Sequence, residues 1–172
     1  MTDALHIRDL HESEAEALGQ LLVAVYSQLP GFPRSDEQPG YYEMLAAIGA
    51  FTKRPLTQVL VALHQNTLVG GVVYFGDMAQ YGSGGTATSV PNAAGIRLLA
   101  VSPNARGLGV GKALTAACIA RARQQQRVEV VLHTTKAMQV AWAMYEKLGF
   151  VRSPDLDFLQ GELPVFGFRL RL

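Results

Sequence analysis

The sequence LLAVSPNARGLGVGK, residues Leu98–Lys112, carries an apolar run into a glycine-rich turn that opens a predicted helix. The three alternate glycines have no side chains, so their main-chain N–H groups can approach an anion closely. The first turn of a helix adds unpaired N–H donors and the positive end of the helix dipole. Arg106 and Lys112 place positive charge on both sides of the turn. The segment therefore predicts a binding site for a diphosphate-bearing ligand.

Two familiar glycine-rich loops do not match this segment. A Walker A loop would need a glycine at Arg106 and a hydroxyl at Ala113. A dinucleotide fingerprint would need its third glycine where Lys112 stands, and its next strand should end near an acidic residue, whereas the predicted strand ends near His133. Nucleotide hydrolysis and hydride transfer are both disfavoured.

A second segment, MYEKLGF at Met144–Phe150, follows the Arg-Gly-x-Gly-x-Gly loop at a distance. Together the two segments resemble the GCN5-related N-acetyltransferase (GNAT) family, most densely over Ala94–Phe150. The resemblance implies one domain over residues 1–172, of α/β class, with a mixed, mostly antiparallel central sheet and helices on both faces. It also implies direct transfer of acetyl from acetyl-CoA to a primary amine of a small molecule or peptide.

The resemblance further implies which residues bind the cofactor. The loop would hold the diphosphate of acetyl-CoA, and the preceding strand would pair with the pantetheine arm. These cofactor-binding residues are Leu99, Ala100, Val101, Arg106, Gly107, Leu108, Gly109, Val110, Gly111 and Lys112. No metal is expected.

Tyr145 is the expected acid that protonates the departing thiolate. A thiol has a pKa of about 8.5 and a phenol one of about 10, so a nearby tyrosine can donate to sulfur as charge develops. The alternative is a core tyrosine that packs its helix against the sheet. Main-chain N–H groups of Leu99–Val101 are expected to hold the oxyanion.

The sequence departs from many relatives at two positions. Gly95 stands where they carry a glutamate that relays the amine proton, and Met138 stands where they carry an asparagine that contacts pantetheine. The general base is therefore unassigned; candidates without a spacing argument are Glu43, Asp77, His133 and Asp157. Tyr41, Tyr42 and Tyr81 are expected either to line the acceptor pocket or to pack in the core.

Two alternatives to acetyl transfer stay open. Gly95 and Met138 motivate a catalytically silent CoA-binding regulatory module. Transfer of a longer acyl group would need extra room beside the Leu99–Val101 strand. Homodimers are common in the family, but no sequence feature establishes one here.

Composition limits the remaining classes of function. The chain has 172 residues, 49% of them hydrophobic, and a net charge of +1 with interleaved signs, which fits one domain and predicts neither a nucleic-acid nor a membrane partner. The first residues lack a leader pattern, so a cytoplasmic location is expected. Cys118 alone cannot form an intrachain disulfide, and no two histidines have the spacing of metal ligands.

Periodicity predicts alternating strands and helices. Expected strands cover residues 5–8, 59–63, 68–75, 96–101, 128–133, 150–152 and 165–170. Expected helices include one ending near Gln28 with a capping pair at Asp9 and Glu12, and further ones at 41–51, from 110 onward, and at 137–148. A mobile loop is expected over 76–93. The strands at 96–101 and 128–133 should be parallel, joined by a right-handed crossover.

Overall fold

The computed structural model describes residues 4–82 and 84–172. Met1–Asp3, part of the segment read for a leader, and Ser83, within the loop expected over 76–93, lie outside the described residues. The described strands are β1 His6–Asp9, β2 Thr57–His64, β3 Thr67–Phe75, β4 Ala93–Val101, β5 Glu129–Thr134, β6 Val151–Arg152, β7 Phe158–Gln160 and β8 Leu163–Arg171. The α-helices are α1 Ala15–Ser27, α2 Pro39–Ala46, α3 Val110–Gln124 and α4 Gln139–Lys147.

The strands form one sheet in the order β1-β2-β3-β4-β5-β8-β6, and β7 pairs with β8 off this path. Every described pairing is antiparallel except that between β4 and β5, which is parallel. A parallel pair needs a crossover connection, and α3 provides it. The mixed, mostly antiparallel sheet is confirmed.

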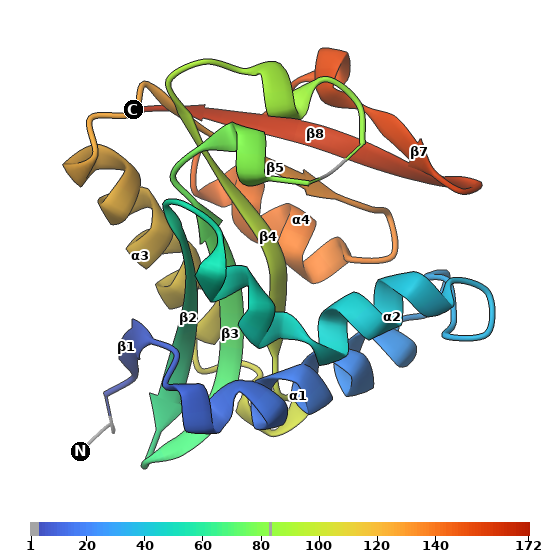
Figure 1. The fold of residues 1–172 in the computed structure, drawn as a ribbon, viewed down its shortest axis with the longest axis vertical. Coiled ribbons are helices and arrows are strands. Elements are labelled where there is room, and N and C mark those ends of the chain that lie inside the picture. Colours follow the sequence, from blue (N-terminus) through green and yellow to red (C-terminus); the bar gives the residue numbers. More distant parts are fainter. Residues whose placement is uncertain (1–3, 83) are drawn as a thin grey trace.

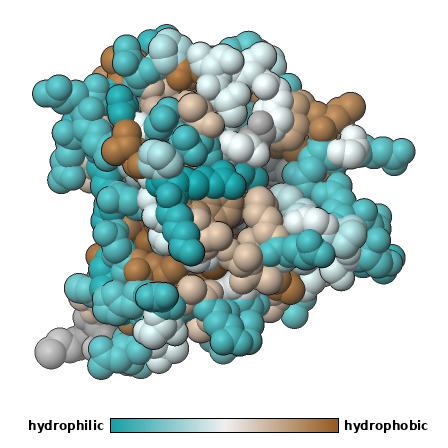
Figure 2. All heavy atoms as spheres, viewed as in Figure 1, coloured by the Kyte–Doolittle hydropathy of each residue, from teal (hydrophilic) through white to brown (hydrophobic). Residues whose placement is uncertain are grey.

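Helices cover both faces of the sheet. Successive residues of a strand point to opposite faces, and in β2 Val61 packs with the α1 and α2 side chains while Leu60 packs with those of α3 and α4. In Figure 1, α1 and α2 lie together low in the view, and α3 and α4 lie on either side of β4. In the same view, Figure 2 shows hydrophilic residues at most margins of the molecule and apolar residues toward the middle.

Residues 41–51 do not form the single helix that periodicity predicts. The helix α2 ends at Ala46, and a 3-10 helix, Ile48–Lys53, continues in a new direction. The expected buried face is right, since Leu45, Ile48 and Phe51 are all buried. The break turns Phe51 onto Phe75 of β3, with ring centroids 5.8 Å apart.

The expected capping pair before α1 is also wrong. Asp9 instead forms an ion pair with Arg121 of α3, at 2.7 Å. The carboxylate of Glu14, not Glu12, accepts the main-chain N–H of His11 at 2.9 Å. Glu14 also accepts two hydrogen bonds from Arg8 of β1, each 2.8 Å, which tie the turn to the strand.

The segment over 76–93 is folded rather than open in its described part. It contains two 3-10 turns, Met78–Gln80 and Ala87–Ser89. The side chains of Met78, Tyr81 and Ala87 are buried in the core. Apolar side chains at these turns fix the segment against the sheet, which a count of its glycine, serine and threonine residues does not reveal.

Candidate active site

The glycine-rich loop lies between the end of β4 and the start of α3. A 3-10 turn, Pro103–Ala105, leads into Gly107 and Gly109, which adopt φ values of +85° and +78°. Such left-handed backbone strongly favours glycine, and both positions have open space around them. Gly111 differs, because a Cβ there would meet Met144 Sδ at 3.4 Å. Two of the three glycines therefore shape the turn, whereas a Cβ at the third would make ordinary van der Waals contacts.

Unpaired donors converge at the start of α3. The N–H of Ala113 bonds to the carbonyl of Gly109 at 2.9 Å, which is the first bond of the helix. Among the described residues, no backbone acceptor meets the four N–H groups that precede it, those of Gly109, Val110, Gly111 and Lys112. The side chains of Arg106 and Lys112 are exposed, with no acidic partner in the part of the chain described. The predicted cation-flanked cradle is present.

A bulge interrupts β4 just before this loop. Leu98 has φ +62°, and the register with β3 shifts between Gly71 and Val73. Positive φ at a residue other than glycine costs about 1–3 kcal/mol and is often found at functional sites. The bulge reverses the alternation of side chains, because Ile96 packs on the α3 side whereas Leu98 packs on the α1 side.

Beyond the bulge, β4 separates from β5. The two strands pair only from Ala93–Glu129 to Ile96–Leu132, although β5 continues to Thr134. The edge of β4 that faces β5 has no strand partner from Arg97 to Val101 within the described residues. The carbonyl of Leu99 accepts a hydrogen bond from the hydroxyl of Tyr26 at 3.0 Å. A free strand edge of this kind can pair with an extended ligand.

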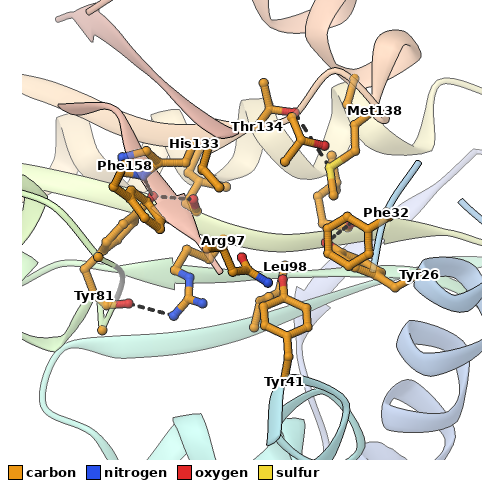
Figure 3. Close-up of a pocket in the computed structure, with 18 of the residues that line it drawn as sticks. Tyr26, Phe32, Tyr41, Tyr81, Arg97, Leu98, His133, Thr134, Met138 and Phe158 are labelled. Carbon is orange, nitrogen blue, oxygen red and sulfur yellow. Dashed lines mark hydrogen bonds between the residues drawn. The ribbon is translucent and has the colours of Figure 1, made fainter. Parts of the chain in front are cut away.

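A cavity of about 280 Å³ opens where the two strands part. It is rich in aromatic side chains contributed by α1, α2, α4, β7 and the connecting loops (Figure 3). Lining aromatic residues are Tyr26, Phe32, Tyr41, Tyr81, Tyr145 and Phe158. Polar lining groups are few, which is typical of small-molecule sites.

Tyr145 reaches this cavity from α4 and is only 5% exposed. Its ring packs edge-on against Phe150, with centroids 5.8 Å apart. No hydrogen bond to its hydroxyl is found within residues 4–82 and 84–172. Burial raises the pKa of this phenol, which therefore keeps its proton at neutral pH. Tyr145 therefore packs in the core with its ring and still has a hydroxyl that can donate a proton.

Comparison with known proteins now identifies the family. A model of the acetyltransferase (GNAT) family matches residues 20–150, well over half of the chain. The chain belongs to the GNAT family. Its sequence is 43% identical over 68 residues to a mycothiol acetyltransferase of Paenarthrobacter aurescens, covering 40% of this chain and 21% of that one. A mycothiol acetyltransferase of Salinispora tropica is 45% identical over 58 residues, 33% of this chain and 19% of that one.

Solved structures of the same fold cover almost the whole GNAT chain. The PaiA N-acetyltransferase of Thermoplasma acidophilum, in complex with coenzyme A, aligns with a TM-score of 0.75 at 16% identity over 98% of this chain and 99% of that one. A GCN5-related N-acetyltransferase from Kribbella flavida aligns with a TM-score of 0.70 at 19% identity over 98% of each chain. At these identities the likeness concerns the fold. The curated relatives differ, since this GNAT chain spans only about a fifth of their length.

The four candidate bases of this GNAT protein are all engaged or remote. Glu43 is exposed on α2, and Asp77 accepts the N–H of Ala79 at 3.0 Å. Asp157 pairs with Arg152 at 2.8 Å. Of the four, only His133 lines the cavity.

His133 lines the cavity with both ring nitrogens bonded. The hydroxyl of Tyr81 lies 2.8 Å from Nδ1, and the carbonyl of Leu156 lies 2.8 Å from Nε2. A carbonyl only accepts, so Nε2 carries the proton and Nδ1 accepts from Tyr81. Burial lowers the pKa of His133, which keeps the ring neutral near pH 7. His133 therefore positions Tyr81 and has no free basic nitrogen.

Of the three tyrosines expected near the acceptor, Tyr41 and Tyr81 line the cavity. Tyr42 does not, because it turns into the core and donates its hydroxyl to the carbonyl of Pro33 at 2.7 Å. Met138, the residue that replaces asparagine, lines the cavity and accepts a weak hydrogen bond from Thr134 at 3.7 Å.

Sequence reasoning missed several lining residues of this GNAT site. The polar ones are Arg97, Thr134, Thr135 and Gln160, and the aromatic ones are Tyr26, Phe32 and Phe158. Thr135 is buried, and its hydroxyl has no hydrogen-bond partner among the described residues. An unpaired buried hydroxyl beside a cavity points to a role in ligand binding, and only the folded chain reveals it.

The described part of the chain contains no cluster of histidine, cysteine, aspartate and glutamate suited to a metal ion. Cys118 lies in the core of α3, and burial raises the pKa of its thiol to about 12. The thiol is therefore inert packing, as its apolar helix face predicts. No helix in the described residues is long and apolar enough to cross a membrane.

Proposed function

We propose that residues 1–172 form one N-acetyltransferase domain that moves the acetyl group of acetyl-CoA directly to a primary amine of a small molecule or peptide. One observation carries this proposal. The free edge of β4 leads from the anion-binding loop at Val101 to the aromatic cavity at Leu99, where the Tyr145 hydroxyl is unpaired. Membership of the GNAT family supports it.

The residues present fit acetyl-CoA, which supplies acetyl as a reactive thioester. The N–H groups at the start of α3, with Arg106 and Lys112 beside them, suit the diphosphate. The free edge of Leu99–Val101 suits an extended arm with amide groups. The unpaired hydroxyl of Thr135 offers a further hydrogen bond where the strands part.

Two groups of the chain support the reaction itself. Main-chain N–H groups of Leu99–Val101 donate to the carbonyl oxygen on which negative charge develops, at no cost in reorganisation. Tyr145 gives its proton to the departing sulfur. Burial raises the pKa of Tyr145, and the same surroundings raise the pKa of a thiol bound beside it. The difference between the two pKa values therefore stays small enough for the proton to move to sulfur.

The described lining of the cavity does not offer a base for the amine. No carboxylate lines the cavity in the residues described, and both nitrogens of His133 are bonded. A protonated amine has no lone pair with which to attack a carbonyl. The amine therefore enters uncharged and releases one proton to water after attack, and Tyr145 regains its proton from water.

Calorimetry and thiol release test this function together. Acetyl-CoA should bind, and a panel of primary amines should stimulate release of the CoA thiol. Arg106→Ala combined with Lys112→Ala should weaken acetyl-CoA binding about tenfold or more, because charge-assisted hydrogen bonds contribute about 1.5–3 kcal/mol each. Arg123→Ala, an exposed cation near the other end of α3, is the matched control. Folded protein without affinity for acetyl-CoA would refute the proposal.

A silent CoA-binding module is the second candidate, favoured by Gly95 and by the absence of a carboxylate in the described cavity lining. Binding of acetyl-CoA without amine-stimulated thiol release would identify it. The cavity of about 280 Å³ is close to the lower end of the usual range for ligand pockets, roughly 300–1,000 Å³.

A further inference from the structure

A single permanent charge lies in the cavity. Arg97 is the one lysine, arginine, aspartate or glutamate among its described lining residues. In Figure 3 it lies between Tyr81 and Tyr41, with Phe158 and His133 above it in the view. Arg97 is half-buried, so its charge is partly withdrawn from water. A charge in such surroundings needs a partner.

Strand alternation places the guanidinium on the cavity side of the sheet. Ile96 packs on the α3 side, and the neighbouring position Gly95 faces Tyr81 on the α1 side. Arg97 lies on the same face as Gly95, where it meets Tyr81 and Met44. The bulge, with φ +62° at Leu98, then turns the next side chain to this face as well, so that Arg97 and Leu98 both line the cavity.

The guanidinium is only partly satisfied. One nitrogen donates to the carbonyl of Tyr81 at 2.9 Å, and another lies 4.0 Å from the sulfur of Met44, a weak acceptor. No carboxylate pairs with Arg97 anywhere in the described chain, whereas Arg8, Arg121 and Arg169 each have one. An arginine has five N–H donors in a fork that matches a carboxylate, so most of them are free for a ligand.

We propose that the acceptor amine carries a carboxylate and that Arg97 binds this carboxylate. This inference rests on the proposed function. The substrate class is a small amino acid or similar amine, with an apolar body that contacts the aromatic walls formed by Tyr41 and Phe158. The ion pair fixes the acceptor and leaves its uncharged amine to face the thioester.

A carboxylate suits the site better than the other common anions. One cation balances the single charge of a carboxylate, whereas a phosphate monoester carries about −1.5 to −2 at pH 7. The diphosphate of CoA has its own site, since the cavity lining includes no residue of the loop from Arg106 to Lys112. Arg97 is four residues before the end of β4, about 13 Å along a strand.

Matched acceptors test the inference on the unmodified protein. L-phenylalanine, L-phenylalaninamide and 2-phenylethylamine differ in the group next to the amine, and 4-aminobutyrate with butylamine forms a second pair with a longer separation. Thiol release should be compared per uncharged amine, because the carboxylate also changes the pKa of the amine. At least one carboxylated probe should exceed its neutral counterpart about tenfold or more in kcat/KM, mainly through a lower KM.

Variants at Arg97 assign the preference to this side chain. Arg97→Gln should abolish the preference by raising KM for the carboxylated probe only, while Arg97→Lys should keep part of it. Affinity for acetyl-CoA should be unchanged in both. Arg54→Gln is the matched control, since Arg54 also donates to a loop carbonyl, that of Gln80 at 3.0 Å, but does not line the cavity.

The outcomes separate this inference from the function on which it rests. Acetyl-CoA binding and amine-stimulated release without preference for any carboxylated probe would contradict the role of Arg97 and leave acetyl transfer intact. Equal losses with all probes in Arg97→Gln would also contradict it. Absence of acetyl-CoA binding would instead remove the proposed function itself. If Arg97→Gln does not fold, the preference of the unmodified protein for carboxylated acceptors still tests the inference.

Discussion

The ring of Tyr81 occupies the space beside Gly95 where a side chain would otherwise lie. A Cβ built on Gly95 would come within 2.6 Å of Tyr81 Cε1 and 2.8 Å of Met78 Sδ. The ring cannot easily move, because its hydroxyl is bonded to His133 at 2.8 Å. A glutamate at this position, which many relatives carry, would not fit this packing.

Gly95→Ala should therefore destabilise the protein. Overpacking of a well-filled core costs about 1–3 kcal/mol, and the loss should appear as a lower midpoint in urea at unchanged slope. Gly40→Ala in α2 is the control, because nothing lies within 4 Å of a Cβ there. A Gly95→Ala variant as stable as Gly40→Ala would show that the ring of Tyr81 moves aside at little cost in free energy.

Tyr145→Phe should lower turnover without changing cofactor affinity. The ring keeps its packing against Phe150, and only the unpaired hydroxyl is lost. Removal of a general acid lowers kcat by about 10²-fold or more where chemistry is rate-limiting. Steady-state rates and calorimetry with acetyl-CoA measure the two quantities separately.

Tyr42→Phe is the matched control for that variant, because the hydroxyl of Tyr42 lies outside the cavity and bonds to Pro33. It should cost about 1 kcal/mol of stability and leave turnover unchanged. Full activity of Tyr145→Phe would remove the proposed acid.

The pH dependence of kcat/KM should follow the acceptor rather than the protein. His133, whose pKa burial lowers, is already neutral above pH 6.5, and no carboxylate lines the described cavity. The rate should rise about tenfold per pH unit while the amine is protonated and level off above the pKa of the amine. Profiles for two amines of different basicity should be displaced accordingly. One shared pKa for both would point to a base on the protein.

Acid should weaken the fold through Glu14. Two hydrogen bonds from Arg8, each 2.8 Å, lower the pKa of this carboxyl from 4.5 to about 2. A lowered pKa stabilises the native state above the unfolded pKa, and this contribution is lost as pH falls from about 4.5 toward about 2.

Glu14→Gln should thus cost about 1 kcal/mol at pH 7, after allowance for solvent screening of a pair near the surface. Unfolding free energies measured between pH 7 and 3 should converge for the variant and the unmodified protein. Glu16→Gln on α1, whose carboxyl forms no ion pair within the described residues, is the control. A constant difference across this range would show that the carboxylate charge does not stabilise the turn.

Local sequence patterns predicted the loop and most of the sheet. The conformation of the loop depends on residues that are adjacent in the chain: two glycines have positive φ, and the helix starts at Val110. The spacing of the glycines is therefore enough to predict the loop. The hairpin between β2 and β3 is equally local, since Gln65 and Asn66 both take the left-handed conformation. The parallel pairing of β4 with β5 follows from the helix that connects them.

Long-range packing overrode local pattern elsewhere. Periodicity continues through 41–51, yet the helix breaks because Phe51 packs on Phe75. The segment over 76–93 has a composition typical of loops, yet Tyr81 anchors it on Gly95 and His133.

The sequence by itself determined the shape of the glycine-rich helix start and predicted an anion site there, because that chemistry uses main-chain groups placed by adjacent residues. Only the tertiary structure decided which side chains line the cavity. Leu98 adopts φ +62° at the bulge against β3 and so lines the cavity beside Arg97, and Tyr26, Tyr145 and Phe158 meet there from separate elements. The positive φ of one residue and the contacts between side chains far apart in the sequence depend on the free energy of the whole fold. A short sequence pattern therefore does not predict them.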